Sequence, residues 1–174
     1  MNKITAFIPA RGGSKGIPNK NIKDFAEKPL IVHSIKYAQS SQLVDEVVVS
    51  TDDSKISKIA IESGATVIKR PPELSTDTSS TESAIEHYIN FSKQKPDIII
   101  LLQATSPFRP QGSLDKALKR FQKGRYDSLL SICPTHRFFW RVKDDDTIYP
   151  EYNYLNRPRR QDLSWGNMRF IENG

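Results

Sequence analysis

Three glycines and two basic side chains follow the first apolar run of the sequence. The run is Ile4 to Pro9, and the loop after it reads Arg-Gly-Gly-Ser-Lys-Gly over residues 11–16. Because glycine has no side chain, its backbone N–H group can approach an anion closely. Arg11 and Lys15 would add the positive charge that a triphosphate requires. The spacing matches neither a Walker A loop nor Gly-x-Gly-x-x-Gly, so we interpret it as another kind of phosphate-binding turn, with an ordinary glycine turn as the alternative.

Two carboxylates follow the second apolar run, Glu46 to Ser50, in the segment Ser50-Thr51-Asp52-Asp53. A side-chain oxygen at this position commonly accepts hydrogen bonds from the first N–H groups of a helix. We therefore expect Asp52 or Asp53 to cap the helix that follows. A magnesium ligand is the less favoured alternative.

Hydroxyl and amide groups follow two further apolar runs. The loop of residues 69–81 is rich in Ser and Thr and leads into an expected helix N-terminus, where free N–H groups favour an anion or a polar ligand. Thr81, with Glu82 beside it, would either cap that helix or contact a ligand. After the run at residues 98–102, the segment Gln103-Ala104-Thr105-Ser106-Pro107 offers groups that could hydrogen-bond a sugar.

Three arginines lie within four residues in Arg157-Pro158-Arg159-Arg160-Gln161-Asp162. They repel one another unless anions or carboxylates lie between them, and arginine binds phosphate and carboxylate with bidentate geometry. The segment is either a phosphate or carboxylate clamp or a solvated basic turn. The three histidines are too dispersed to indicate a metal site, and no residue is assigned as a metal ligand.

The elements that must position these residues alternate between strands and helices. Apolar runs predict strands at residues 4–9, 46–50, 66–68, 98–102 and 128–132, and helical spacing predicts helices at 29–41, 56–60, 84–89 and 114–121, with Gly64 ending the second. Continuous apolar strands in this order predict an α/β fold with a doubly wound, mostly parallel central sheet and helices on both faces. Ligands then bind beyond the carboxyl ends of the strands, where the segments above would meet.

The pattern changes after Pro134. The sequence here fits neither the period of a helix nor that of a strand: it contains an aromatic run at 138–140, an acidic run at 144–146 and tyrosines at 149, 152 and 154. An aromatic excursion of this kind is either a hairpin arm that packs on a partner or a local satellite core. The sequence ends at Glu172-Asn173-Gly174 without a closing helix, which we interpret as a truncation.

Composition narrows the class of protein. The 174 residues fit a single domain, 1–174, and no apolar stretch approaches the ~20 residues of a membrane span. One cysteine, Cys133, excludes a disulfide framework, and no signal peptide is evident; a cytoplasmic protein is expected. The net charge of +6 could reflect nucleic-acid binding, a polyanionic substrate or a solvated surface. The last two fit better because basic residues fall in loops: Arg11, Lys15, Lys20, Arg70, Arg109, Arg159 and Arg160.

Together these segments resemble the acylneuraminate cytidylyltransferases, also called CMP-sialic acid synthetases. The resemblance rests on residues 10–21, 49–52, 103–107, 157–162 and 172–174, in the order of the family. It implies a Rossmann-like nucleotidyltransferase fold with a CTP site at the glycine-rich loop, and a homodimer formed through an arm at approximately residues 135–160. It also implies that Mg²⁺ is held by an Asp-x-Asp motif in the C-terminal part of the family domain, which we expect to be missing from this chain.

The resemblance also implies roles for individual residues. Lys15 and the segment Arg159, Arg160 and Gln161 would be catalytic. The residues implied to bind nucleotide or sugar are Arg11, Gly12, Gly13, Ser14, Asn21, Arg70, Ser79, Thr81 and Gln103. The implied reaction joins CMP from CTP to a sialic-type nonulosonic acid and releases pyrophosphate.

Three alternatives stay open. The first is a CMP-sugar synthetase for legionaminate, pseudaminate or 3-deoxy-manno-octulosonate. The second is a nucleotide-sugar glycosyltransferase, which would require an Asp-x-Asp motif after a middle strand; residues 50–53 match it only in part. The third is a nucleic-acid-binding module, for which the sequence offers no platform of aromatic and basic residues. We therefore expect neither nucleic acid nor membrane as a partner.

Overall fold

The computed structural model describes residues 2–159, 161 and 168–173. One compact unit ends at Leu129, and a second runs from Leu130 to Asn173. In the described residues, no helix is long and apolar enough to cross a membrane.

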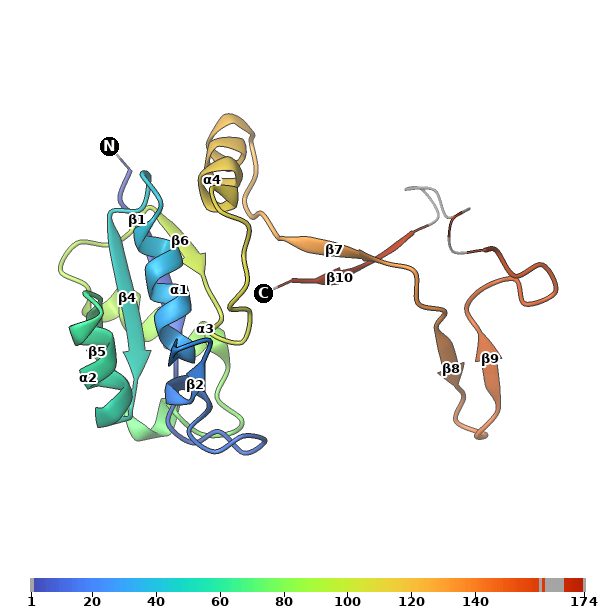
Figure 1. The fold of residues 1–174 in the computed structure, drawn as a ribbon, viewed down its shortest axis with the longest axis horizontal. Coiled ribbons are helices and arrows are strands. Elements are labelled where there is room, and N and C mark those ends of the chain that lie inside the picture. Colours follow the sequence, from blue (N-terminus) through green and yellow to red (C-terminus); the bar gives the residue numbers. More distant parts are fainter. Residues whose placement is uncertain (1, 160, 162–167, 174) are drawn as a thin grey trace. The chain divides into compact units, whose positions relative to one another are not determined.

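A parallel sheet of four strands forms the centre of the first unit (Figure 1). Its strands are β1 (Ile4–Pro9), β4 (Glu46–Thr51), β5 (Thr66–Lys69) and β6 (Ile98–Leu101), in the order β5-β4-β1-β6. The two central strands are buried almost throughout, as their β-branched composition predicts. Since β1 lies between β4 and β6, the strand order reverses at β1, and the loop after β1 lies where such sheets bind ligands.

Helices cover both faces of this sheet. α1 (Leu30–Gln39) and α2 (Ser54–Glu62) pack against Ala6, Ile8 and Val49, which point to one face. α4 (Ser113–Lys123) packs on Ile4 at the same face through Leu114 and Leu118. On the opposite face α3 (Thr81–Phe91) packs Ala84 and Tyr88 against Phe7 and Val48. The predicted doubly wound α/β fold is confirmed.

Short elements complete the first unit. β2 (Asp24–Phe25) and β3 (Lys28–Pro29) form an antiparallel hairpin before α1, and Ala26 and Glu27 at its turn both have positive φ angles. Two 3₁₀ turns, η1 (Lys20–Ile22) and η2 (Pro72–Leu74), lie in the loops after β1 and β5. These loops carry most of the predicted ligand-binding residues.

The helix caps agree with the sequence in two cases and differ in one. Asp53 caps α2, because its Oδ1 accepts hydrogen bonds from the N–H groups of Lys55 and Ile56. Of the two roles left open for Thr81, capping is excluded: Ser80 caps α3 by accepting from the Ser83 N–H group, and Thr81 is the first helical residue. The hydroxyl that caps α3 therefore belongs to Ser80, one residue before Thr81.

Gly64 ends α2 as predicted, with a φ angle of 84°. Its N–H group donates to the Ile61 carbonyl and the next N–H group, of Ala65, donates to the Ala60 carbonyl. We expect Gly64→Ala to lower the free energy of unfolding by about 1–2 kcal/mol, because a left-handed conformation is costly for any residue with a Cβ atom. Urea denaturation measures this change. Gly16→Ala is the control, since a Cβ atom there meets open space; equal stability of the two variants would contradict the prediction.

The expected strand at residues 128–132 is wrong. Residues 128–131 form no strand, and β7 (Ile132–Thr135) pairs antiparallel with β10 (Arg169–Glu172) in the second unit. A short apolar run does not reveal its partner, and here the partner lies more than thirty residues further along the chain.

The second unit also contains a hairpin of β8 (Trp140–Val142) and β9 (Ile148–Pro150). The rings of Phe138 and Trp140 contact that of Tyr152. Glu151 pairs with Arg141 and Arg169, and these arginines, Arg141 first, hold the pKa of its carboxyl below the usual range. The aromatic excursion thus forms local ring contacts, whereas its role as a dimerisation arm stays a prediction.

Candidate functional site

A cavity of about 580 Å³ lies at the carboxyl edge of the parallel sheet. Its walls come from the end of β1, the glycine-rich loop, the residue after β5, the start of α3 and the residues after β6. Of the predicted site residues, those that line it are Arg11, Ser14, Lys15, Asn21, Arg70, Ser79, Thr81 and Gln103. Four segments that are far apart in the sequence therefore meet at one site, as the strand-end argument predicts.

Within the glycine-rich loop, Gly12 contacts the protein itself. Its N–H group donates to Asp52 Oδ1 at 2.9 Å, and a Cβ atom built on it would lie 2.8 Å from Asp53 Cβ. Gly12 is thus a glycine because the loop packs tightly on the start of α2. Gly12 and Gly13 both lie outside the residues that line the cavity, so their predicted contact with nucleotide stays a prediction.

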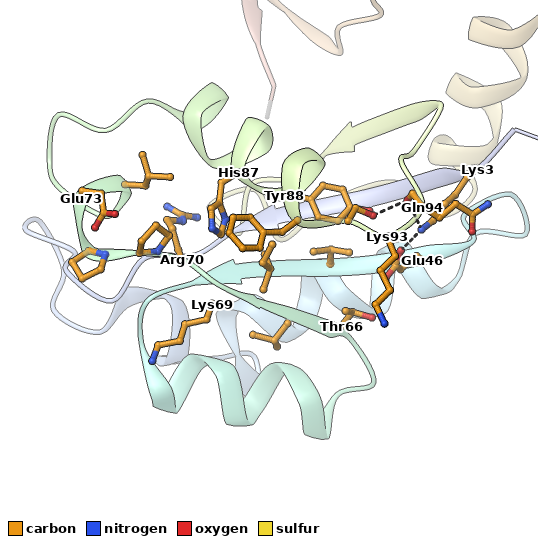
Figure 2. Close-up of a pocket in the computed structure, with 18 residues that line it drawn as sticks. Lys3, Glu46, Thr66, Lys69, Arg70, Glu73, His87, Tyr88, Lys93 and Gln94 are labelled. Carbon is orange, nitrogen blue, oxygen red and sulfur yellow. Dashed lines mark hydrogen bonds and ion pairs between the residues drawn. The ribbon is translucent and has the colours of Figure 1, made fainter.

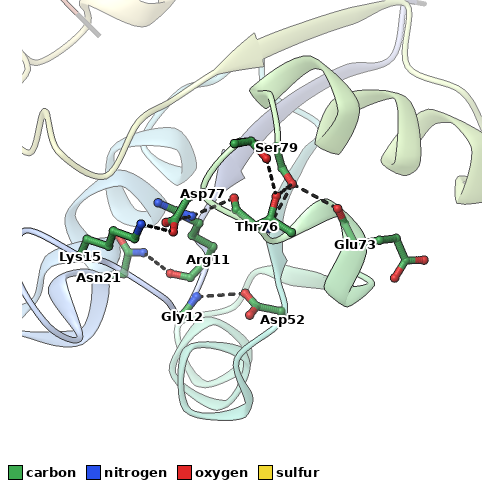
Figure 3. A network of polar contacts seen from close by, with 10 residues as sticks. Arg11, Gly12, Lys15, Asn21, Asp52, Glu73, Thr76, Asp77 and Ser79 are labelled. Atoms are coloured by element: carbon green, nitrogen blue, oxygen red, sulfur yellow. Dashed lines mark hydrogen bonds and ion pairs between the residues drawn. The ribbon is translucent and has the colours of Figure 1, made fainter.

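Arg11 and Lys15 point toward the same carboxylate (Figure 3). Arg11 Nη1 contacts Asp77 Oδ1 at 2.8 Å and donates to the Thr76 carbonyl oxygen, also at 2.8 Å. Lys15 Nζ lies 2.6 Å from Asp77 Oδ2. The hydrogen bond from Lys15, followed by that from Arg11, holds the pKa of the Asp77 carboxyl below its usual range. The two cations are therefore close enough to bind one anion together.

Asn21 supports the backbone at Arg11. Its Nδ2 donates to the Arg11 carbonyl oxygen at 3.0 Å, and the residue is only 7% exposed. Asn21 lies within η1, two residues after Asn19, which has a positive φ angle of 55°. The amide of Asn21 thus fixes the start of the loop, at Arg11, to its later part, which carries Lys20, another residue that lines the cavity.

Arg70 is buried at the inner wall, with 5% of its surface exposed. Its Nε donates to Ser50 Oγ at 3.0 Å and its Nη2 donates to the Ser50 carbonyl oxygen at 2.8 Å. Burial lowers the pKa of the guanidinium, Asp52 opposes that change and Arg11 adds to it. β4 and β5 together therefore hold one positive charge at the base of the cavity.

The loop that leads into α3 is held by its own hydrogen bonds. Ser79 Oγ lies 2.7 Å from Thr76 Oγ1, accepts from the Thr76 N–H group and donates to the Glu73 carbonyl oxygen. Ser79 and Thr81 line the cavity on either side of the capping Ser80. The first turn of α3 consequently faces the same space as Arg11 and Arg70.

Gln103 and Arg109 follow β6 but differ in position. Gln103 lines the cavity, and its backbone carbonyl oxygen accepts a hydrogen bond from Arg109 Nη2 at 2.7 Å. Arg109 also donates to Ser34 Oγ and lies over the ring of Tyr37 at 5.4 Å. Arg109 therefore fixes the loop to α1, and it is outside the lining of the cavity.

A larger hollow, of about 1220 Å³, lies between β5 and α3 on the α3 face (Figure 2). Its lining is mainly apolar, with the pair Lys3–Glu46 among its polar residues. Of the predicted site residues that the structure describes, it contains Arg70 alone. Size alone would thus select the wrong hollow for the predicted chemistry.

The predicted catalytic arginine segment belongs to the second unit. Arg159 lines a hollow of about 530 Å³ with His136, Phe138, Arg157 and Pro158, and Arg157 lies 4.3 Å from the centre of the Phe138 ring. Gln161 is exposed, and Arg160 is outside the described residues. Their catalytic role stays a prediction.

Comparison with known proteins identifies the family of the chain. Residues 5–150 match the family described as Cytidylyltransferase. The chain belongs to the cytidylyltransferase family. The N-acylneuraminate cytidylyltransferase A of Danio rerio is 44% identical over 167 residues, which are 92% of this chain and 38% of that protein. The predicted resemblance to the acylneuraminate cytidylyltransferases is therefore confirmed.

Two further cytidylyltransferases extend the comparison. The pseudaminic acid cytidylyltransferase of Campylobacter jejuni is 34% identical over 170 residues, covering 93% of this chain and 73% of that protein. The structure of CMP:2-keto-3-deoxy-manno-octonic acid synthetase complexed with CTP is similar with a TM-score of 0.61 and 27% identity, over 75% of this chain and 50% of that one. This cytidylyltransferase chain thus spans about two fifths of the Danio rerio relative and about three quarters of the Campylobacter jejuni one.

Among the described residues, no three or more His, Cys, Asp or Glu side chains are grouped closely enough to hold a metal ion by themselves. Asp52 accepts from Gly12, and Asp53 Oδ1 caps α2. The two carboxylates considered as possible magnesium ligands are therefore engaged with backbone N–H groups.

Two residues in and beside the cavity have no role that the sequence predicts. Lys20, expected only as a basic loop residue, lines the cavity, and Asp77 contacts the lining residues Arg11 and Lys15 without lining the cavity itself. A signal for Asp77 was present, because it is the one acidic residue among residues 75–81. A lone carboxylate opposite a cationic loop is a candidate for an ion pair.

Proposed function

We propose that this chain carries the nucleotide-binding site of an enzyme that transfers CMP from CTP to a sialic-type nonulosonic acid and releases pyrophosphate. The anomeric C2 hydroxyl of the acid would attack the α-phosphorus of CTP. Phosphoryl transfer depends mainly on positioning the reactants and on stabilising charge. The observation that carries the proposal is the shared cavity of Arg11, Lys15, Arg70 and the start of α3 at the carboxyl edge of the sheet.

The cavity supports a division of roles. Arg11 and Lys15 would bind the phosphates, because their cationic groups already converge on one carboxylate. Asn21 would hold the nucleotide loop, and Arg70, Ser79 and Thr81 would line the nucleotide and sugar pocket. Gln103, which follows β6, would contact the sugar, and Gly12, Gly13 and Ser14 would shape the phosphate loop. Arg159, Arg160 and Gln161 would supply the catalytic arginine segment.

Two relatives favour a second candidate within the same reaction. They are named for pseudaminic acid and for 2-keto-3-deoxy-manno-octonic acid, and both match most of this chain. Each of these acids presents a keto-acid carboxylate and an anomeric hydroxyl to the nucleotide. The proposed substrate class is therefore a nonulosonic or related keto acid, with the sialic type favoured by the 44% identity to the Danio rerio relative.

The proposal includes the setting in which the enzyme works. Mg²⁺ would neutralise the triphosphate when bound, with ligands outside the described residues. A homodimer is supported by the exposed apolar side chains of the hairpin, among them Trp140, Val142 and Ile148. The proposed location is the cytoplasm, where CTP is available. Neither nucleic acid nor a membrane is included as a partner.

Pyrophosphate release from CTP tests the function. The protein is incubated with CTP, Mg²⁺ and, in separate reactions, N-acetylneuraminic, legionaminic, pseudaminic or 3-deoxy-manno-octulosonic acid. We expect release that depends on one of the acids, and the acid with the highest kcat/KM identifies the substrate. Calorimetry with CTP and Mg²⁺ is the companion measurement. Absence of CTP binding would overturn the proposal.

A further inference from the structure

The Asp77 carboxylate occupies the space in which Arg11 and Lys15 converge (Figure 3). One oxygen contacts Arg11 at 2.8 Å and the other contacts Lys15 at 2.6 Å. Each oxygen thus has its own cation, which is the arrangement that a phosphate group would adopt between these side chains. Asp77 stands in for an anionic ligand at this position.

The contact joins two separate loops. Arg11 and Lys15 belong to the glycine-rich loop after β1, whereas Asp77 belongs to the loop between η2 and α3. The second loop is already held by hydrogen bonds among Thr76, Ser79 and Glu73. Because these bonds involve no Asp77 side-chain atom, the Asp77 carboxylate can leave the cations without dismantling its own loop.

We propose that Asp77 is an internal competitor for the phosphate position, and that an incoming nucleotide must displace its carboxylate from Arg11 and Lys15. This inference rests on the proposed function, since it assigns those two cations to the phosphates of CTP. A triphosphate carries more negative charge than one carboxylate and can engage both cations and Arg70 together. The nucleotide therefore wins the competition, but its affinity is reduced by the free energy of the contact that it replaces.

The exposure of the three side chains sets the size of the effect. Arg11, Lys15 and Asp77 are 32%, 79% and 42% exposed, so water screens the pairs. Exposed ion pairs contribute little to stability, which corresponds to a change in affinity of about two- to fivefold. Because Lys15 and Arg11 depress the pKa of Asp77, the competing carboxylate is charged at neutral pH. It is lost only when the pH falls through that lowered pKa.

The variant Asp77→Asn tests the competition. Binding of CTP and of inorganic pyrophosphate is measured by calorimetry at low ionic strength with EDTA. We expect both ligands to bind Asp77→Asn about two- to fivefold more tightly than the wild type, and the gain to shrink in high salt, which screens exposed charges. Asp77→Ala, which also removes the hydrogen-bonding group, should show a gain in the same direction.

Glu73→Gln is the matched control. Glu73 lies in η2, just before the loop that carries Asp77, and the variant loses the same charge, but the Glu73 carboxylate points away from Arg11 and Lys15 (Figure 3). We expect its affinity for both ligands to stay near that of the wild type. An equal gain in Glu73→Gln would show a general charge effect and overturn the proposal, as would unchanged or weaker binding in both Asp77 variants. If the wild type and every variant also fail to bind CTP when Mg²⁺ is supplied in place of EDTA, the proposed function itself is overturned.

Discussion

Arg11→Ala is expected to reduce turnover by roughly 10²–10³-fold, the usual effect of removing one charged contact that acts in a transition state. Arg11 lines the cavity, and its guanidinium faces the position assigned to phosphate. Pyrophosphate release with saturating acid measures turnover, and calorimetry measures the accompanying loss of CTP affinity. The fold should persist, because the contacts of Arg11 with Thr76 and Asp77 lie at the surface.

Arg120→Ala is the control for this experiment. Arg120 lies exposed on α4 and outside the lining of the cavity. Arg120→Ala removes the same charge from the protein as Arg11→Ala, so a general effect of net charge would appear in both variants. Normal turnover in Arg11→Ala, or an equal loss in Arg120→Ala, would refute the phosphate site.

Gly12→Ala should both destabilise the protein and impair the reaction. The added Cβ atom would lie 2.8 Å from Asp53 Cβ and 2.9 Å from Asp53 Oδ2. Asp53 cannot withdraw without losing its cap on α2. Overpacking of this kind costs about 1–3 kcal/mol, and a displacement of the loop by about 1 Å can reduce turnover roughly 10²-fold. Urea denaturation and pyrophosphate release measure the two effects.

Gly13→Ala tests whether the effect of Gly12→Ala comes from close packing rather than from the loss of a glycine. It is the same change one residue further along, where a Cβ atom meets nothing within 4 Å. We expect its free energy of unfolding to stay within about 0.5 kcal/mol of the wild type, as for an ordinary surface substitution. If Gly12→Ala proved as stable as Gly13→Ala, the close packing of the loop on α2 would not be the reason for glycine at position 12.

The sequence predicted the central sheet because its strands are mostly apolar runs, of which β1 and β4 are buried almost throughout. Residues 4–9, 46–50 and 98–102 are continuous apolar runs, and the observed strands agree with them to within one residue. Residues 128–132 carry a similar run, yet β7 begins only at Ile132 and pairs with β10. Hydrophobic pattern reports burial but not the partner of a strand, which depends on contacts distant in the sequence.

The site was predictable in its members but not in its internal contacts. The strand-end rule brings Arg11, Arg70 and Gln103 to one edge of the sheet. The rule does not reveal the position of Arg109, which also follows a strand. Its guanidinium donates to Gln103 and Ser34 and does not line the cavity. Nor does the rule reveal the Asp77 contact, because the pairing of two loops depends on their three-dimensional course.

The capping of α2 by Asp53 has a consequence for how this protein binds an anion. The carboxylate offsets the partial positive charge at the start of α2 and occupies its N–H groups. The helix after β4 therefore offers little attraction to a ligand, and the full positive charges that line the cavity belong to separate side chains, those of Arg11, Lys15, Lys20 and Arg70. A site built in this way can be retuned one substitution at a time, whereas an anion site made of backbone amides would change only with the course of the main chain.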